Sequence, residues 1–216
     1  DWWVRIFDFP RSQITVLSIA VLAASPFVLE LNSANTGFVA ILALAAVYQI
    51  HMMFPYLPIA RPQVEQSKEP RGDNSVDLLF ANVLQDNERS ADLLKMIERV
   101  DADIVLLVET DDRWASELSQ LRDSYPHCVE HISDDTYGMM LFSRLELIDP
   151  QIKFLIDDNV PSIHADVLLR SGRRIAIRCL HPPPPVPTFA TRSIERDAEL
   201  LIVGKEVKDL KLPVIV

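Results

Sequence analysis

Two long apolar runs near the start of the chain dominate its hydrophobic pattern. Residues 14–29 contain no ionisable group, and residues 38–54 contain only His51. Each run approaches the roughly 20 residues that a bilayer-spanning helix requires. A polar turn at residues 32–37 separates the runs, and four aromatic residues lie near their ends, as in the interfacial belt of membrane proteins: Trp2, Trp3, Tyr48 and Tyr56. We therefore predict a membrane anchor over residues 1–60, with transmembrane helices at about 14–31 and 38–54. The alternative is a pair of buried core helices.

The pattern changes to short alternating elements after a polar linker at residues 61–75 that contains proline and glycine. Near-continuous apolar runs predict buried strands at 76–83 and 103–109. Apolar residues at three- and four-residue spacing predict helices at 88–100 and 114–125. The later elements are four short strands, a helix and a last strand, at 127–132, 138–143, 164–169, 174–180, 192–207 and 212–216. Residues 76–216 are therefore expected to form an α/β domain.

Charge separates the two parts of the chain. The net charge is −10 over 216 residues, and residues 1–60 carry only −1 of it. An acidic domain excludes a broad basic face that follows nucleic-acid phosphates, so nucleic acid is not the favoured partner and a metal ion is expected to handle any phosphate. Cys128 and Cys179 either pair or are two buried thiols, of which buried thiols are favoured.

Three polar residues lie where apolar strands end, a place where α/β sheets commonly present functional groups: Asn82, Glu109 and His181. A carboxylate suits a hard cation such as Mg²⁺, which takes oxygen ligands and keeps several waters. An imidazole can donate a proton or a hydrogen bond to a phosphoryl oxygen near neutral pH. Taken singly, each of the three is more often a capping, turn or structural residue. His127 and His131 are interpreted as structural. His164 is interpreted as either packed or solvent-facing.

Five segments follow one another in a characteristic order. They are LLFANV (78–83), ADIVLLVET (102–110), YGMMLFSR (137–144), RIAIRCLHPPPP (174–185) and LPVIV (212–216). In this order they resemble the endonuclease/exonuclease/phosphatase family, over the whole of residues 76–216. The resemblance implies a four-layer α-β-β-α sandwich, here partial and preceded by the two transmembrane helices, with a divalent-metal site at one end.

The resemblance also implies a role for each matching position. Glu109 becomes the Mg²⁺-binding carboxylate, with Mn²⁺ as the alternative ion. Asn82 becomes a catalytic residue of the metal site that orients the substrate, and His181 the catalytic histidine that contacts phosphate. Tyr137 lies beside the floor of the active site as a substrate-binding residue. Two arginines are candidate contacts for an anionic substrate, with a solvated helix face as the alternative: Arg192 and Arg196.

One part of the family pattern is absent. After the strand that begins at Pro213 the family has a Gly-Asp-x-Asn turn, and near its C-terminus an Asp-His pair that activates the attacking water. Neither occurs before Val216. We therefore expect the stretch 76–216 alone to be inactive and poorly folded.

Together these features predict a membrane-anchored, divalent-metal-dependent phosphoesterase that hydrolyses a phosphoester or phosphoanhydride. The apolar anchor and the acidic domain favour a phosphate-containing substrate held at the bilayer, such as a lipid phosphate or pyrophosphate, with membrane lipid as a second partner. The alternatives are a membrane-tethered nuclease of the same family and a non-catalytic membrane binding module.

The chain is expected to be a multi-pass protein of the plasma or inner membrane. Basic residues lie before the first apolar run and after the second: Arg5, Arg11, Arg61, Lys68 and Arg71. The turn between the runs contains none. By the positive-inside rule, both ends of the hairpin are then in the cytoplasm. Some membrane-anchored members of the family that this chain resembles have their catalytic domain outside the cytoplasm and are associated with the undecaprenyl pyrophosphate carrier. Both orientations stay open, with a slight preference for the extracytoplasmic one.

Overall fold

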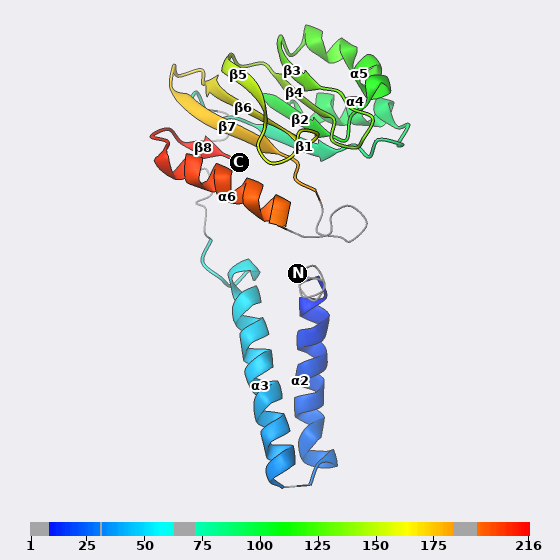
Figure 1. Ribbon diagram of the computed structural model, residues 1–216, viewed down its shortest axis with the longest axis vertical. Coiled ribbons are helices and arrows are strands. Elements are labelled where there is room, and N and C mark those ends of the chain that lie inside the picture. Colours follow the sequence, from blue (N-terminus) through cyan, green and yellow to red (C-terminus); the bar gives the residue numbers. More distant parts are fainter. Residues whose placement is uncertain (1–8, 31, 63–71, 184–193) are drawn as a thin grey trace. The chain divides into compact units, whose positions relative to one another are not determined.

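The computed structural model describes residues 9–30, 32–62, 72–183 and 194–216 (Figure 1). The chain divides into two units, residues 1–68 and residues 69–216. The first unit is a helical hairpin and the second a mixed α/β fold. Some residues named above lie outside the described ranges: Trp2, Trp3, Arg5, Lys68, Arg71 and Arg192.

The hairpin consists of α2 (Arg11–Val28) and α3 (Ser33–Met53), followed by the short 3-10 helix η2 (Phe54–Tyr56). Helices form at both predicted places, but each begins earlier than the apolar run does. Ser12 and Gln13 continue α2 beyond the first run, and Asn32 caps α3, since its side chain accepts a hydrogen bond from Asn35 N–H (2.8 Å). Among the described residues, these are the two helices long and apolar enough to cross a membrane.

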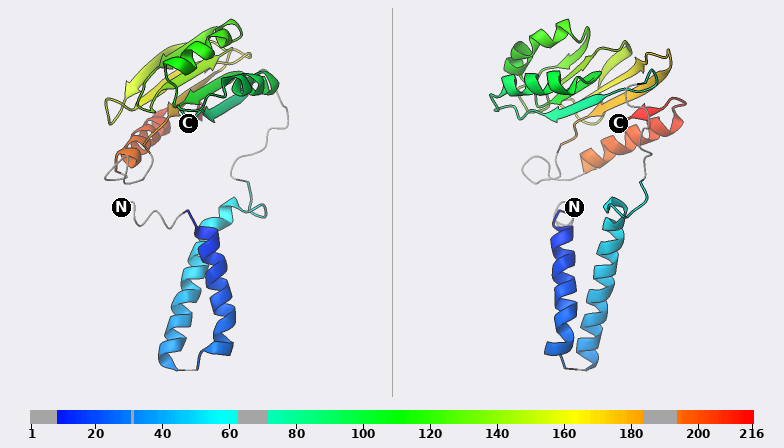
Figure 2. Two further views of the ribbon diagram at one scale, coloured as in Figure 1. Left: turned by 90° about the vertical axis from the view of Figure 1, so that its right-hand side faces the viewer. Right: turned by 180° about the vertical axis from the view of Figure 1, so that it is seen from behind.

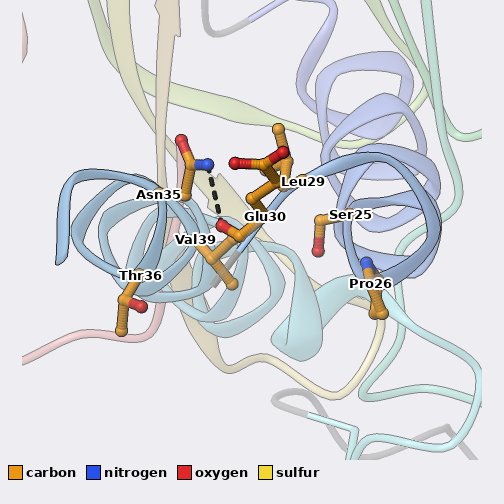
Figure 3. A pocket seen from close by; sticks show the side chains of 7 residues that line it. All are labelled: Ser25, Pro26, Leu29, Glu30, Asn35, Thr36 and Val39. Atoms are coloured by element: carbon orange, nitrogen blue, oxygen red, sulfur yellow. Dashed lines mark hydrogen bonds between the residues drawn. The ribbon is translucent and has the colours of Figure 1, made fainter. Parts of the chain in front are cut away.

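The end of α2 contains a proline whose effect on the helix is compensated locally. Pro26 has no N–H, so the carbonyl of Leu22 lacks its usual partner. The hydroxyl of Ser25 donates to that carbonyl instead (2.8 Å). A cavity of about 290 Å³ lies beside this point at the closed end of the hairpin, where Asn35 donates to the carbonyl of Glu30 (2.9 Å; Figure 3). The proline is therefore accommodated without an unpaired carbonyl at this turn.

The first sheet of the second unit has the strand order β1-β2-β4-β3. The strands are β1 (Leu78–Asn82), β2 (Ile104–Val108), β3 (His127–His131) and β4 (Met139–Ser143). β1 and β2 are parallel, and the other pairs are antiparallel. The helices α4 (Ser90–Val100) and α5 (Asp112–Glu117) connect its strands.

The single helix predicted at 114–125 is wrong. α5 ends at Glu117, and residues Ser119–Asp123 form the 3-10 helix η3. Both helix types place apolar residues at three- or four-residue spacing on one face, so the pattern does not distinguish them. The residues that gave the pattern are nevertheless all buried, as their spacing requires: Trp114, Leu118, Leu121 and Tyr125.

The second sheet has the order β5-β6-β7-β8. Its strands are β5 (Leu147–Phe154), β6 (Pro161–Leu168), β7 (Arg174–Leu180) and β8 (Val214–Ile215), and α6 (Ile194–Asp209) precedes the last of them. β5 is missing from the sequence-based prediction. It is largely exposed and its pairing with β6 is irregular between Ile148 and Gln151, so neither an apolar run nor a strict alternation marks it.

Two clusters of buried side chains show how the layers pack. One joins the facing sides of the two sheets, including Leu106, Leu141, Ile163 and Ile177. The other joins α4 and α5 to the outer side of the first sheet, through residues such as Ile97, Trp114 and Leu107. α6 lies on the outer side of the second sheet, where Glu206 pairs with Arg178 of β7 (2.8 Å), and Figures 1 and 2 show it opposite α4 and α5. The predicted α-β-β-α order is confirmed.

The two thiols are free, as favoured above. Cys179 is buried between the sheets, whereas Cys128 in β3 is half-buried. Burial raises the pKa of each to about 12, so both stay protonated at neutral pH.

Candidate functional site

Three strand ends carry the polar residues that the sequence singled out. Asn82 is the last residue of β1, Glu109 follows β2, and His181 follows β7. Because β1 and β2 are parallel and Asn82 is in register with Val108, Asn82 and Glu109 lie at the same edge of the first sheet. Directly after them, the side chain of Asp111 accepts a hydrogen bond from Trp114 N–H (2.8 Å) and caps α5, so the chain turns away from this edge.

These side chains make direct contacts. Asn82 Nδ2 donates to Glu109 Oε1 (2.5 Å), and Asn82 Oδ1 accepts from Leu84 N–H (2.9 Å). His181 Nε2 lies 3.7 Å from the same Glu109 oxygen. The ring of Tyr137 packs against the ring of His181, with their centroids 6.1 Å apart. The residues at the ends of β1 and β7 thus contact the carboxylate that follows β2, and the loop before β4 adds a ring that packs against His181.

Arg196 is placed differently from the other candidates. It lies in α6, half-buried. None of the contacts found among the described residues joins it to Asn82, Glu109, His181 or Tyr137. A contact between Arg196 and an anionic substrate stays a prediction.

The backbone around this cluster is strained. Five non-glycine residues have positive φ in the described part of the chain, and three of them flank the site: Leu84 (58°), Glu109 (64°) and Thr136 (72°). The left-handed conformation costs a residue with a β-carbon about 1–2 kcal/mol. Such strain persists only where the surrounding structure fixes the backbone, and it often gathers at functional sites.

A close backbone contact joins the residue after Glu109 to the residue after Tyr137. Thr110 N–H donates to the carbonyl of Gly138 (3.2 Å), which extends the pairing of β2 with β4. A β-carbon on Gly138 would lie 1.6 Å from the carbonyl oxygen of Thr110. Only glycine fits at this position, because the neighbouring atom belongs to the main chain and cannot rotate away.

The protonation of His181 is set mainly by burial. Removal from solvent lowers its pKa below the ordinary value, and the negative charge of Glu109 opposes this shift only in part. The imidazole is therefore neutral at pH 7, with one ring nitrogen carrying a proton.

The oxygen donors of the site fit a hard divalent cation. Glu109 offers a carboxylate, and the carbonyl oxygen of Asn82 has a second lone pair beyond its bond to Leu84. The hydroxyl of Thr110, the next residue after Glu109, is buried without a hydrogen-bond partner. No group of three or more His, Cys, Asp or Glu that could hold a metal occurs within the described ranges. This set suits Mg²⁺, which binds through one or two carboxylates and keeps its waters.

The structure also connects Gln85 to the segments next to the cluster, a link that the sequence reasoning missed. Its side chain contacts the loop that carries Tyr137, and its carbonyl contacts α5. The available signal was a long polar side chain three residues after a strand-ending asparagine, which is too common in turns to be informative.

Known proteins show which fold this is. The family model described as endonuclease/exonuclease/phosphatase family matches residues 77–216. The crystal structure of D. rerio TDP2 complexed with single-strand DNA product is similar with a TM-score of 0.55 at 19% identity, over 64% of this chain and 57% of that one. Selenomethionine TDP2 from Caenorhabditis elegans gives a TM-score of 0.52 at 12% identity, over 92% of this chain and 61% of that one. No curated protein matches the sequence.

Proposed function

Because the chain belongs to the endonuclease/exonuclease/phosphatase family, whose members hydrolyse phosphoesters, we propose that it is part of a membrane-anchored, Mg²⁺-dependent phosphoesterase. The observation that carries the proposal is the contact of Asn82 and His181 with the carboxylate of Glu109, with the Tyr137 ring packed against His181. A single carboxylate held by an amide, with a neutral imidazole beside it, suits phosphate chemistry that relies on a cation. Mn²⁺ is the alternative ion.

Each residue has a distinct part in this proposal. Glu109 holds the cation, together with the amide oxygen of Asn82, and the bound cation neutralises charge on the non-bridging oxygens of the phosphate. The Asn82 amide donates to Glu109 and so fixes the direction of the carboxylate. His181 donates a hydrogen bond to a phosphate oxygen, and the arriving negative charge favours its protonated form, as a donor to the leaving oxygen requires. Tyr137 limits the rotation of the His181 ring.

The two apolar helices support a substrate at the bilayer. Both helices are long and apolar enough to span the bilayer, and residues 61–216 carry a net charge of −9. Such a charge repels a nucleic-acid backbone. We therefore propose a lipid phosphate or pyrophosphate as the substrate. The competing function is a tethered nuclease, which is favoured by the fold of TDP2, a protein whose structure contains a single-strand DNA product.

A comparison of two glutamates tests the proposal. Because residues 76–216 alone are expected to be inactive, the whole protein that contains this chain is purified in detergent. Mg²⁺-dependent release of phosphate from a lipid pyrophosphate is measured beside the cleavage of a single-stranded oligonucleotide. Glu109→Gln should lower turnover by roughly two to three orders of magnitude, because it removes the charge that holds the cation. Glu206→Gln is the matched control, since Glu206 in α6 also lies beside a histidine, His164 of β6, away from the strand ends.

The outcomes separate the candidate functions. Preferential turnover of the lipid supports the proposal, and preferential cleavage of the oligonucleotide supports the nuclease. Activity retained in Glu109→Gln would remove Glu109 from the metal site. Binding of Mn²⁺ without turnover of either substrate would indicate a non-catalytic binding module.

A further inference from the structure

One glutamine side chain bridges two loops that flank the candidate site. Gln85 lies in the turn after β1, three residues beyond Asn82. Its Nε2 donates to the carbonyl of Asp134 (3.1 Å), and its Oε1 accepts from Thr136 N–H (3.0 Å). Both partners belong to the loop that leads to Tyr137. One amide group thus bonds a carbonyl and an N–H two residues apart, in the way that a neighbouring strand does.

The main chain of Gln85 is held from another direction. Its carbonyl accepts hydrogen bonds from Arg113 Nη2 (2.6 Å) and Trp114 Nε1 (3.2 Å). Both donors lie in α5, which begins three residues after Glu109. Arg113 also donates to the carbonyl of Asn87 (3.0 Å), and the Trp114 side chain is part of the core under the first sheet. Gln85 therefore joins the segments that follow Asn82 and Glu109 to the segment that precedes Tyr137.

The strained backbone near the site lies on both sides of this bridge. Leu84, with a φ of 58°, precedes Gln85 directly, and Thr136, with a φ of 72°, donates its N–H to the Gln85 side chain. Left-handed residues of this kind relax unless contacts hold them. The hydrogen bonds of Gln85 act on both segments at once, so they connect the conformation of one to that of the other.

We propose that Gln85 is a positioning residue of the Glu109 site, which sets the Tyr137 ring against His181 while it holds the turn after Asn82. Its effect on turnover rests on the proposed function, whereas its effect on the place of Tyr137 does not. A residue that only stabilised the loops would change the melting temperature without moving the Tyr137 ring in the folded protein.

Fluorine NMR can follow this ring directly. The sequence contains four tyrosines, so 3-fluorotyrosine labelling of the protein in detergent gives a simple spectrum. Tyr137→Phe assigns the Tyr137 signal, and His181→Gln measures how far that signal depends on the neighbouring ring. Tyr125, buried against Phe142, reports on the fold in the same sample.

Gln85→Leu removes both side-chain hydrogen bonds at similar volume. We expect it to shift the Tyr137 signal and to abolish the response of that signal to His181→Gln, with the Tyr125 signal unchanged. Gln120→Leu is the matched control, because Gln120 of η3 also donates to a backbone carbonyl, that of Glu117 at the end of α5 (3.4 Å), only three residues away. It should leave the Tyr137 signal in place. Turnover of Gln85→Leu should fall roughly tenfold in kcat with little change in KM, as for a misplaced catalytic group.

Each result decides the question. A Tyr137 signal that stays in place in Gln85→Leu overturns the proposal. If Gln85→Leu does not fold, Gln85→Glu keeps the length and the acceptor for Thr136 but loses the donor to Asp134, and it should give a smaller shift. Loss of the Tyr125 signal in both variants would assign Gln85 to folding and overturn the proposal. If the wild-type protein shows no turnover, the proposed function is refuted. A shift of the Tyr137 signal in Gln85→Leu would still support the positioning role.

Discussion

The second unit contains two histidine–glutamate pairs of similar geometry and different setting. His181 Nε2 lies 3.7 Å from Glu109, and His164 Nδ1 lies 3.5 Å from Glu206. Burial lowers the pKa of both histidines. The side chain of His181 is 22% exposed at a strand end, whereas that of His164 is 3% exposed in the middle of β6. The imidazole of the first pair is partly exposed and that of the second is buried, although Glu206 is itself 30% exposed.

The partners of each glutamate explain the difference. Glu206 receives a hydrogen bond from Arg178 Nε (2.8 Å), so its charge is already neutralised inside the protein. Glu109 receives only a neutral amide, that of Asn82, among the hydrogen bonds described for it. A carboxylate paired with arginine contributes to the fold, and a carboxylate paired with an amide keeps its charge for a cation. The same two residue types thus occur in two settings: next to an arginine between α6 and the second sheet, and next to an amide at the strand ends, where we propose the phosphate chemistry.

Replacing Arg178 should give the largest effect on the difference between the two pairs. Arg178→Met should destabilise the second unit by about 4 kcal/mol, because it leaves the half-buried charge of Glu206 unpaired and frees the carbonyl of Ala165. The melting temperature measured by differential scanning fluorimetry should fall by roughly 10 °C. Arg89→Met, which breaks the exposed pair with Asp92, is the control and should cost less than about 1 kcal/mol. Equal effects of the two variants would contradict a structural role for the pair of Arg178 and Glu206.

Replacing each histidine by glutamine separates effects on catalysis from effects on stability. His181→Gln should lower Mg²⁺-dependent kcat roughly a hundredfold, as expected for the loss of a proton donor, with little change in melting temperature. His164→Gln should do the reverse, since its ring fills a buried site and contacts the Ser162 hydroxyl (3.2 Å). Its kcat should stay within about twofold of the wild type. A large kcat loss in His164→Gln would place the second pair in the reaction as well.

The pH dependence of stability gives the smallest and most specific effect. Burial, with the nearby charges of Lys153 and Arg178, lowers the pKa of His164 to about 4, against the opposing charge of Glu206. In the unfolded chain His164 takes up a proton near pH 6.5. The stabilisation that neutral His164 gives the folded state is therefore fully present above that pH and is lost as the pH falls toward 4. The loss should amount to about 2 kcal/mol. Urea unfolding between pH 7.5 and 4.5 should show a flatter profile in His164→Gln, and an unchanged profile would exclude this histidine as its source.

Part of this site could be predicted from sequence because of how strands end. Asn82, Glu109 and His181 each follow an apolar run, and polar residues at such places tend to meet at one edge of a sheet. The order of these segments also gave the family and the four layers. Of the two settings predicted for His164, packing or solvent exposure, its burial supports packing.

Other features depend on tertiary contacts that leave no local pattern. The bridge made by Gln85 joins residues 49 and 51 positions apart, so nothing in its immediate sequence marks it. β5 was missed because its exposed, irregular course does not alternate, and η3 was taken for a continuation of α5 because the two helix types share their apolar spacing. Sequence periodicity reports which residues are buried more reliably than which hydrogen bonds the backbone forms.

The contact between Gly138 and Thr110 has a genetic consequence. Every single-nucleotide change in a glycine codon that alters the amino acid introduces a residue with a β-carbon or a stop. At position 138 any β-carbon would overlap the carbonyl oxygen of Thr110, and the main chain that carries Glu109 would have to shift. Residue 138 is thus a position without a tolerated missense change, at which one base substitution disturbs the candidate site without touching any residue that binds or reacts.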